Sequence, residues 1–185
     1  MNKDVEHLLR GVATSHPRTV RDGWRNLLSA GSDAIPPIKD KLSSISWKEY
    51  PRGPQGQYLA VLLSLLHEID AEHAKTEIKR LNSSPLHAMH RRTVSLIEAR
   101  YDKRPEKHLI AGIPVTISRS IKGEDRVKNL LKKWLKTPPR ADLQHIARID
   151  VVPFSNELDY LGYYMIHSSG ICLTWPSPAG GRFQD

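Results

Sequence analysis

The sequence contains a single cysteine, Cys172, among its 185 residues. One thiol cannot form an internal disulfide, so the chain is not a small secreted domain held together by disulfide bonds, and we expect a reducing compartment. Cys172 lies between Ile171 and Leu173. An apolar neighbourhood of this kind predicts a small buried side chain and not a catalytic nucleophile.

Long apolar runs are also missing. The longest, from Tyr58 to Leu66, is interrupted by Ser64 and reaches only about half the length of a membrane-spanning helix. The first residues, MNKDVEHLLRG, carry a charge at the third position and lack the apolar segment of a signal peptide. We therefore expect a cytoplasmic protein with no membrane partner.

Complete catalytic motifs are absent from the sequence. No glycine pattern typical of nucleotide-phosphate binding occurs, and Gly180-Gly181-Arg182 is too short to count as one. The adjacent carboxylates Glu124 and Asp125 indicate the start of a helix and not an acid-base pair. We therefore expect no enzymatic activity from this chain.

The nine histidines form no recognisable metal motif. His67 and His73 are six residues apart, about 120° out of alignment on a helix, whereas the zinc peptidase motif needs two histidines four apart. His87 and His90 are three apart and are weak candidates for a metal site, because two nitrogens alone do not complete one. Structural or surface histidines are the better interpretation, and no cofactor is predicted.

Positive charge is plentiful and unevenly distributed. The net charge is +8, and residues 91–140 hold 14 Lys and Arg against 5 Asp and Glu. Such a concentration can attract phosphate groups or an acidic partner, although a solvated surface that keeps the protein soluble is the simpler explanation. The apolar fraction of 39% is that of an ordinary globular protein.

Hydrophobic periodicity predicts helices throughout the first hundred residues. Pro17 suits the first turn of a helix, Gly31 its end, and Ser32 or Asp33 the start of the next. The helix over residues 55–70 is apolar around most of its circumference, so we expect it to be central. The predicted helices span residues 3–14, 17–31, a third with Ile35, Ile38 and Leu42 inward, 55–70, a fifth from Ala71 to Leu81, and 85–101.

Two of these helix pairs can be overlaid at a period near forty residues. Trp24, Leu27 and Leu28 match Leu62, Leu65 and Leu66 after 38 residues, and Leu42 matches Leu81 after 39. With the turn in LLSAGSDAIPPIKDKL, residues 3–101 resemble HEAT repeats, which stack antiparallel helix pairs and mostly serve as binding surfaces. An ordinary bundle of helices of similar length is the alternative.

The second half of the chain changes from helical to strand periodicity after the linker YDKRPEKH. Ile113, Val115 and Ile117 alternate with polar residues, and Pro114 suggests an edge strand or the beginning of a strand. A helix follows, with Val127, Leu130, Leu131 and Trp134 on its inner side and lysines outside. Strands are predicted over residues 148–154, 161–167 and 171–175, with a hairpin at Ser168-Ser169-Gly170. The predicted order is β-α-β-β-β.

The string IARIDVVPFSNELDYLGYYMIHSSGICLTW resembles the strands that precede the catalytic helix of ImmA/IrrE-like zinc metallopeptidases. The resemblance covers residues 109–176 and implies a zinc-binding His-Glu-x-x-His helix after Trp175, which the sequence up to Asp185 does not contain. It therefore implies either a truncated piece or a degenerate relative without catalysis. Zinc is expected under this alternative alone, and no catalytic residue is carried over.

Nucleic-acid binding is a further alternative. If the last helix of the first half adjoins the helix of the second half, their cations form one stripe suited to phosphate or partner contacts. The residues are Arg91, Arg92, Arg100, Lys128, Lys132, Lys133 and Lys136. No known DNA-binding motif accompanies them, so we do not expect sequence-specific binding.

The interpretation that follows is an α+β protein in which HEAT-like antiparallel helical repeats precede a small β-α-β-β-β domain. The first domain covers residues 1–103, the second residues 109–176, and residues 177–185 form a loose tail. We expect a non-enzymatic binding or adaptor protein, whose helical-repeat surface and basic face engage a macromolecule. A protein is the first expectation for that partner, and nucleic acid is the second.

Overall fold

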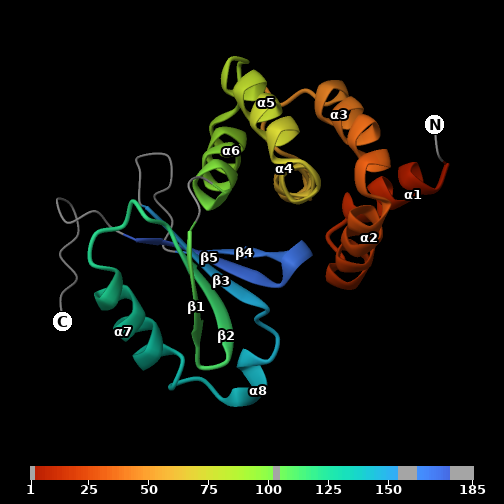
Figure 1. The fold of residues 1–185 in the computed structure, drawn as a ribbon. Helices are drawn as coiled ribbons and strands as arrows, with labels where there is room; N and C mark the ends of the chain where they lie inside the picture. Colours follow the sequence, from red (N-terminus) through yellow and green to blue (C-terminus); the bar gives the residue numbers. More distant parts are fainter. Residues whose placement is uncertain (1–2, 102–104, 154–161, 176–185) are drawn as a thin grey trace. The chain divides into compact units, whose positions relative to one another are not determined.

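A computed structural model describes residues 3–101, 105–153 and 162–175 of the chain. It confirms the α+β class, with helices first and a five-stranded mixed sheet after them (Figure 1). The chain divides into two compact units, Met1–Glu98 and Ala99–Asp185. The predicted tail, 177–185, lies outside the described residues. Among the described helices, none is both long enough and apolar enough to cross a membrane.

The helices of the first unit begin and end close to the predicted positions. Pro17 opens the second helix, and Gly31 ends it with a positive φ of 57°, a conformation that glycine adopts without steric cost. A short 3-10 turn over Gly31–Ala34 then leads into the third. The helices are α1 (Lys3–Val12), α2 (Pro17–Ala30), α3 (Ile35–Ser44), α4 (Gln55–Ile69), α5 (Ala71–Asn82) and α6 (Ala88–Tyr101), whose last residues belong to the second unit.

Helix α4 lies at the centre of the first unit, as its apolar circumference predicts. All nine residues from Tyr58 to Leu66 are buried. Burial raises the pKa of the Tyr58 hydroxyl to about 12. The helix contacts α2, α3 and α5, so its side chains form the middle of the apolar core that this unit removes from water.

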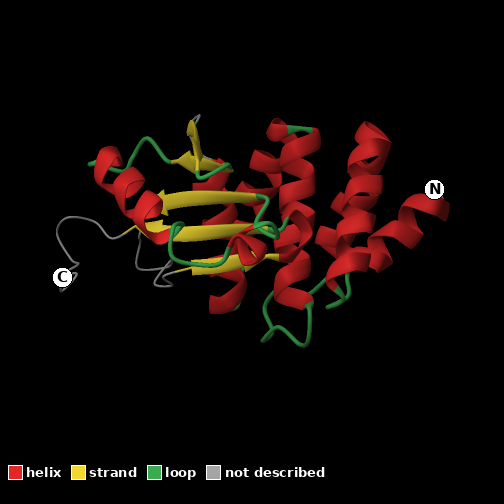
Figure 2. Cartoon of the chain, turned by 90° about the horizontal axis from the view of Figure 1, so that it is seen from below, coloured by secondary structure: helices red, strands yellow, loops and turns green. Residues whose placement is uncertain are grey.

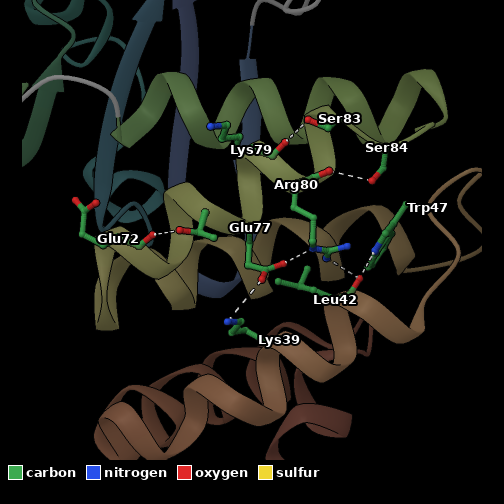
Figure 3. Close-up of polar contacts among 10 residues, drawn as sticks. Lys39, Leu42, Trp47, Glu72, Glu77, Lys79, Arg80, Ser83 and Ser84 are labelled. Carbon is green, nitrogen blue, oxygen red and sulfur yellow. Dashed lines mark hydrogen bonds and ion pairs between the residues drawn. The ribbon is translucent and has the colours of Figure 1, made fainter.

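Polar contacts join α3 to α5 at the edge of that core (Figure 3). The buried carboxylate of Glu77 on α5 lies 3.9 Å from the Lys39 ammonium on α3 and 2.7 Å from Nε of Arg80. The guanidinium of Arg80 also donates to the carbonyl oxygen of Leu42, which accepts a second hydrogen bond from the indole of Trp47. These bonds satisfy a carbonyl at the end of α3 that has no partner within the helix.

The second unit contains the sheet, whose strand order is β1-β2-β3-β5-β4. The outer pairs β1–β2 and β4–β5 are antiparallel, and β3 is parallel to both β2 and β5. Figure 2 shows the strands, in yellow, side by side. The strands are β1 (Glu106–Ile110), β2 (Ile113–Ile117), β3 (Arg148–Pro153), β4 (Gly162–Met165) and β5 (Gly170–Trp175).

The predicted β-α-β-β-β order is wrong, because two strands, β1 and β2, precede α7. The first three residues of β1 belong to the predicted linker YDKRPEKH. Of the two alternatives for Pro114, the edge strand is wrong, since β2 lies between β1 and β3, and the beginning of a strand is confirmed, since β2 starts at Ile113. Pro114 is tolerated there because the parallel pairing with β3 begins only at Val115. The β4–β5 hairpin is confirmed, but Ser169 adopts the positive φ of its turn, not Gly170.

The two faces of the sheet have different chemistry. One face carries Val115, Ile117, Ile149 and Val151, which form a single core with helix α7 (Glu124–Trp134). The other face carries Thr116, Asp150 and Cys172 in register across the three central strands. Cys172 is buried, as predicted, and burial raises the pKa of its thiol to about 12. A short helix, α8 (Arg140–Leu143), precedes β3.

The buried stripe of α7 differs from the predicted one. Val127, Leu131 and Leu135 are buried, whereas Leu130 and Trp134, which we predicted to face inward, are each 44% exposed. Successive members of the true stripe are four residues apart, so each turns by about 40° from the last. Leu135 lies just past the helix end and was not part of the predicted stripe, and its burial rotates the contact face away from Leu130 and Trp134.

Replacement of Glu77 by alanine is expected to destabilise the protein by about 1–2 kcal/mol. The reason is that Lys39 and Arg80 both lose the carboxylate that they pair with, on a side chain only 6% exposed. The matched control is Glu72→Ala on the same helix. Glu72 is 80% exposed and pairs with Lys75 three residues later, so its loss should cost less than about 0.5 kcal/mol. Urea unfolding followed by circular dichroism measures both, and equal losses would contradict this account of Glu77.

Candidate functional site

Helix α7 begins and ends in ways that complement its dipole. Gly123 precedes it with a φ of 82°, a left-handed conformation that favours glycine. Glu124 and Asp125 occupy the first turn, and Lys132 and Lys133 the last. Each acidic residue near the N-terminus of a helix and each basic residue near its C-terminus stabilises the helix by about 0.3–1 kcal/mol. The helix therefore separates charge along its length.

The exposed side of α7 combines cations with apolar groups. We call it the α7 outer face and define it by residues that are all exposed to solvent. They are Arg126, Leu130, Lys132, Lys133 and Trp134 on the helix and Lys136 just past its end. Within the described part of the chain, none of the four cations takes part in an ion pair. Their charges are therefore available to an anionic partner.

Lys128 differs from the other lysines of this helix. Its ammonium lies 2.6 Å from the Glu124 carboxylate and 3.2 Å from that of Asp125. The hydrogen bond to Glu124 raises the pKa of Lys128, and the same bond lowers the pKa of Glu124. Lys128 was predicted to contact phosphate or a partner, but its charge is already engaged within the helix.

The remaining predicted cations do not share one environment. Arg91 is exposed and Arg92 is half-buried, and both belong to the first unit. Arg100 belongs to the second unit, where its side chain is only 1% exposed and its Nε lies 2.8 Å from Asp150. Arg100 is therefore not a surface cation, and the stripe that joins Arg91 and Arg92 to α7 stays a prediction.

Asp150 lies at the centre of a buried charge cluster on β3. One of its oxygens pairs with Arg100, and the other accepts hydrogen bonds from Arg148 and Thr116. Two guanidiniums around a side chain that is 2% exposed compensate the cost of burying its charge. With both oxygens engaged, this carboxylate stabilises the sheet and is a poor candidate for acid-base catalysis.

His167 is buried in the turn between β4 and β5, within electrostatic range of these arginines. Burial, together with the positive charges of Arg100 and Arg148, lowers the pKa of His167 from 6.5 to about 3. The imidazole is therefore neutral at physiological pH. A neutral buried histidine next to cations contributes to pH-dependent stability and does not titrate in the range where a general base would act.

The weak metal candidates His87 and His90 do not belong to a three-ligand cluster among the described residues. His90 is fully buried, its Nδ1 lies 2.8 Å from the carbonyl oxygen of Trp47, and its ring packs edge-on against that indole. The ring of His87 is 6.3 Å from that of His90, centroid to centroid. His90 therefore fixes the loop after α3 against the start of α6, which is a structural role.

Two features of this unit were missed at the sequence level. The exposure of Trp134 gives α7 an aromatic surface beside its lysines. In addition, Glu106 and His108 on β1 lie close to Glu124. The alternation Glu-x-His is typical of one face of a strand, whereas the charged residues around it favour a linker.

No protein-family model matches the chain, and neither a curated protein nor a solved structure is significantly similar to it. What the protein does must therefore be inferred from its own residues.

Replacement of His167 by glutamine is expected to reduce the acid sensitivity of the fold. Because the pKa of His167 falls on folding, its stabilising contribution is complete above about pH 6.5 and is lost as the pH falls toward 3. The wild-type unfolding free energy should decrease by up to about 1.4 kcal/mol per pH unit from this group below pH 6.

Urea titrations at pH 7, 6, 5 and 4.5 measure this slope. The slope should be shallower by about that amount in His167→Gln, while His145→Gln, at an exposed position, should keep the wild-type slope. Parallel profiles for His167→Gln and wild type would contradict the assignment.

Proposed function

We propose that this protein is a non-enzymatic binding protein that holds single-stranded nucleic acid on the α7 outer face. The observation that carries the proposal is the exposure of Trp134, 44%, on a helix whose Lys132 and Lys133 are exposed and form no ion pair with any described residue. Lysines contact phosphates at any sequence, and an exposed indole stacks on any base. Together they favour a nucleic acid over an acidic protein, which offers charge without bases.

A single strand fits this face better than a duplex. Aromatic stacking needs an unpaired base, and Trp134 lies within the same two turns as Arg126, Leu130 and Lys133. Leu130 precedes Trp134 by four residues, so both lie on one side of the helix and extend the apolar surface available to a base. The absence of a known recognition motif in the sequence supports binding without sequence preference.

The expected salt dependence follows from the number of available cations. Each phosphate contact releases condensed counterions, and for single strands the slope of log affinity against log salt is about −0.7 per contact. Four contacts, one for each cation of the α7 outer face, would weaken binding about fifty-fold between 50 and 200 mM salt. A purely apolar interaction would show no such dependence.

Reversal of two charges on α7 is expected to weaken binding of a fluorescein-labelled oligothymidylate at least about tenfold and to flatten the salt slope, since two phosphate contacts are lost. The variant is Lys132→Glu with Lys133→Glu, measured by fluorescence anisotropy at 100 mM salt. The control has the same change in net charge at two exposed lysines of the first unit, Lys48→Glu with Lys79→Glu. Equal losses in both variants, or affinity that does not vary with salt, would contradict the proposal.

Loss of the exposed indole is expected to reduce affinity for the same oligonucleotide by about 5- to 150-fold, because base stacking contributes roughly 1–3 kcal/mol. The variant is Trp134→Ala, and Trp134→Phe should retain most of the affinity. The matched control, Leu130→Ala, removes an equally exposed apolar side chain without a π-face. If Leu130→Ala and Trp134→Ala lose the same affinity, Trp134 acts by apolar contact and not by stacking.

A HEAT-like array in the first unit is a second proposal, with a protein as its partner. In a stacked array each helix packs on its counterpart in the next repeat. The contacts of α2 with α4, and the ion pair between Lys39 on α3 and Glu77 on α5, support that arrangement. Superposition of residues 17–44 on residues 55–82 in an experimental structure tests it, and helix axes that diverge would remove it.

A relation to ImmA/IrrE-like zinc metallopeptidases is a third proposal. Its support is that β3, β4 and β5, the strands that carry the resemblance, are neighbours in one sheet. The natural reading frame tests it directly. A continuation past Asp185 into a His-Glu-x-x-His helix would favour this proposal over a binding function, and a stop codon at that point would remove the peptidase activity from consideration.

A further inference from the structure

Residues 91–140 form the most basic segment of the chain, yet most of their acidic residues lie close to one another. Three of the five carboxylates in residues 91–140 are Glu106, Glu124 and Asp125. Glu106 and Glu124 meet at His108, whose Nε2 lies 2.8 Å from Oε1 of Glu124 and 3.9 Å from Oε2 of Glu106, while Asp125 contacts Lys128. One ammonium, that of Lys128, lies among them. Three carboxylates therefore lie near a single ammonium, so acidic groups outnumber basic side chains of lysine and arginine at this place.

Strand and helix geometry place these donors together. Glu106 and His108 are two residues apart on β1, so their side chains project from the same face of the sheet as the buried Ile110. That face belongs to the core beneath α7, and Glu124 is the first residue of this helix. Ile110 and Val127 pack in the same cluster, so β1 and the start of α7 are held against each other. The donors are therefore fixed by packing before any ligand binds.

From this arrangement we propose that Glu106, His108 and Glu124 form a binding site for a divalent transition metal ion of the zinc class. One atom from each of the three side chains lies within 4.8 Å of the other two. Donors that share a zinc ion at about 2.1 Å are roughly 3 to 3.5 Å apart. Small rotations of the two carboxylates bring all three donors to that spacing, because each glutamate ends in a rotatable bond.

The donor set indicates which metals fit. One imidazole nitrogen with two carboxylates suits zinc, cobalt or nickel, whereas calcium and magnesium prefer oxygen donors alone. The ligand atoms Nε2 of His108 and Oε1 of Glu124 are shielded from water, which strengthens their attraction for a cation. Glu106 is about half exposed, so the fourth position faces solvent and would hold water or an external ligand.

Lys128 makes the proposal sharply testable, because its ammonium and the metal compete for the same oxygen of Glu124. If the metal site exists, removal of the ammonium should strengthen metal binding. If the Lys128–Glu124 salt bridge has only a structural role, its removal should leave the metal affinity unchanged. The variant Lys128→Met keeps most of the aliphatic chain and leaves Glu124 free to bind the ion. Variants at the donors should have the opposite effect.

Isothermal titration of the untagged full chain with Zn²⁺ at pH 7.5 measures affinity, and the visible absorption of bound Co²⁺ reports a nitrogen- and oxygen-ligated site. We expect one ion per chain, an affinity at least about tenfold lower in His108→Ala and in Glu106→Gln, and a higher affinity in Lys128→Met. A tenfold excess of Mg²⁺ should not compete. Circular dichroism of each variant confirms that it is folded.

The controls are histidines outside the cluster. His145→Ala changes an exposed residue, and His87→Ala changes the only half-exposed member of the His87/His90 pair. Neither should alter the affinity for Zn²⁺. Failure of wild type to bind Zn²⁺, unchanged binding in folded His108→Ala, or loss of binding in His87→Ala would each overturn the proposal. Oligonucleotide affinity is measured separately, so either proposal can fail while the other stands.

Discussion

The side of α7 that packs on the sheet decides what the second unit presents to solvent. Val127, Leu131 and Leu135 are the buried residues, and they share a core with Val115 and Ile149. Once those side chains are inside, the helix has no freedom to rotate about its axis without exposing them, at roughly 1.5–3 kcal/mol for each buried aliphatic side chain. The exposure of Trp134, the outward position of the lysines and the placement of Glu124 beside β1 all follow from this one packing contact.

Charge separation along the same helix gives its two ends different chemistry. At the N-terminal end, Glu124 joins Glu106 and His108 of β1 in a locally acidic cluster. At the C-terminal end, Lys132, Lys133 and Trp134 are all exposed. The helix dipole favours this distribution in both cases. The positive total for residues 91–140 therefore hides an anionic spot, and net charge alone would have indicated only anion binding.

Local signals predicted most helices of the first unit because each boundary rests on a local physical cause. Pro17 supplies a first-turn residue that needs no amide donor, and Gly31 supplies the positive φ that ends α2. Strand β1 was missed because a short edge strand with charged residues at Glu106 and Lys107 has little alternation to detect. It forms because β2 supplies its hydrogen-bonding partners, which a sequence pattern does not contain.

Local periodicity and apolar content were enough to predict the α+β class, the central position of α4 and the burial of Cys172. Only the tertiary structure decided that Arg100 is paired with Asp150 inside the protein, that Trp134 faces water, and that Glu106, His108 and Glu124 meet. Each of these depends on contacts between residues distant in the chain. A helical pattern with apolar residues at both i+3 and i+4 leaves the buried side undetermined until a sheet packs against it.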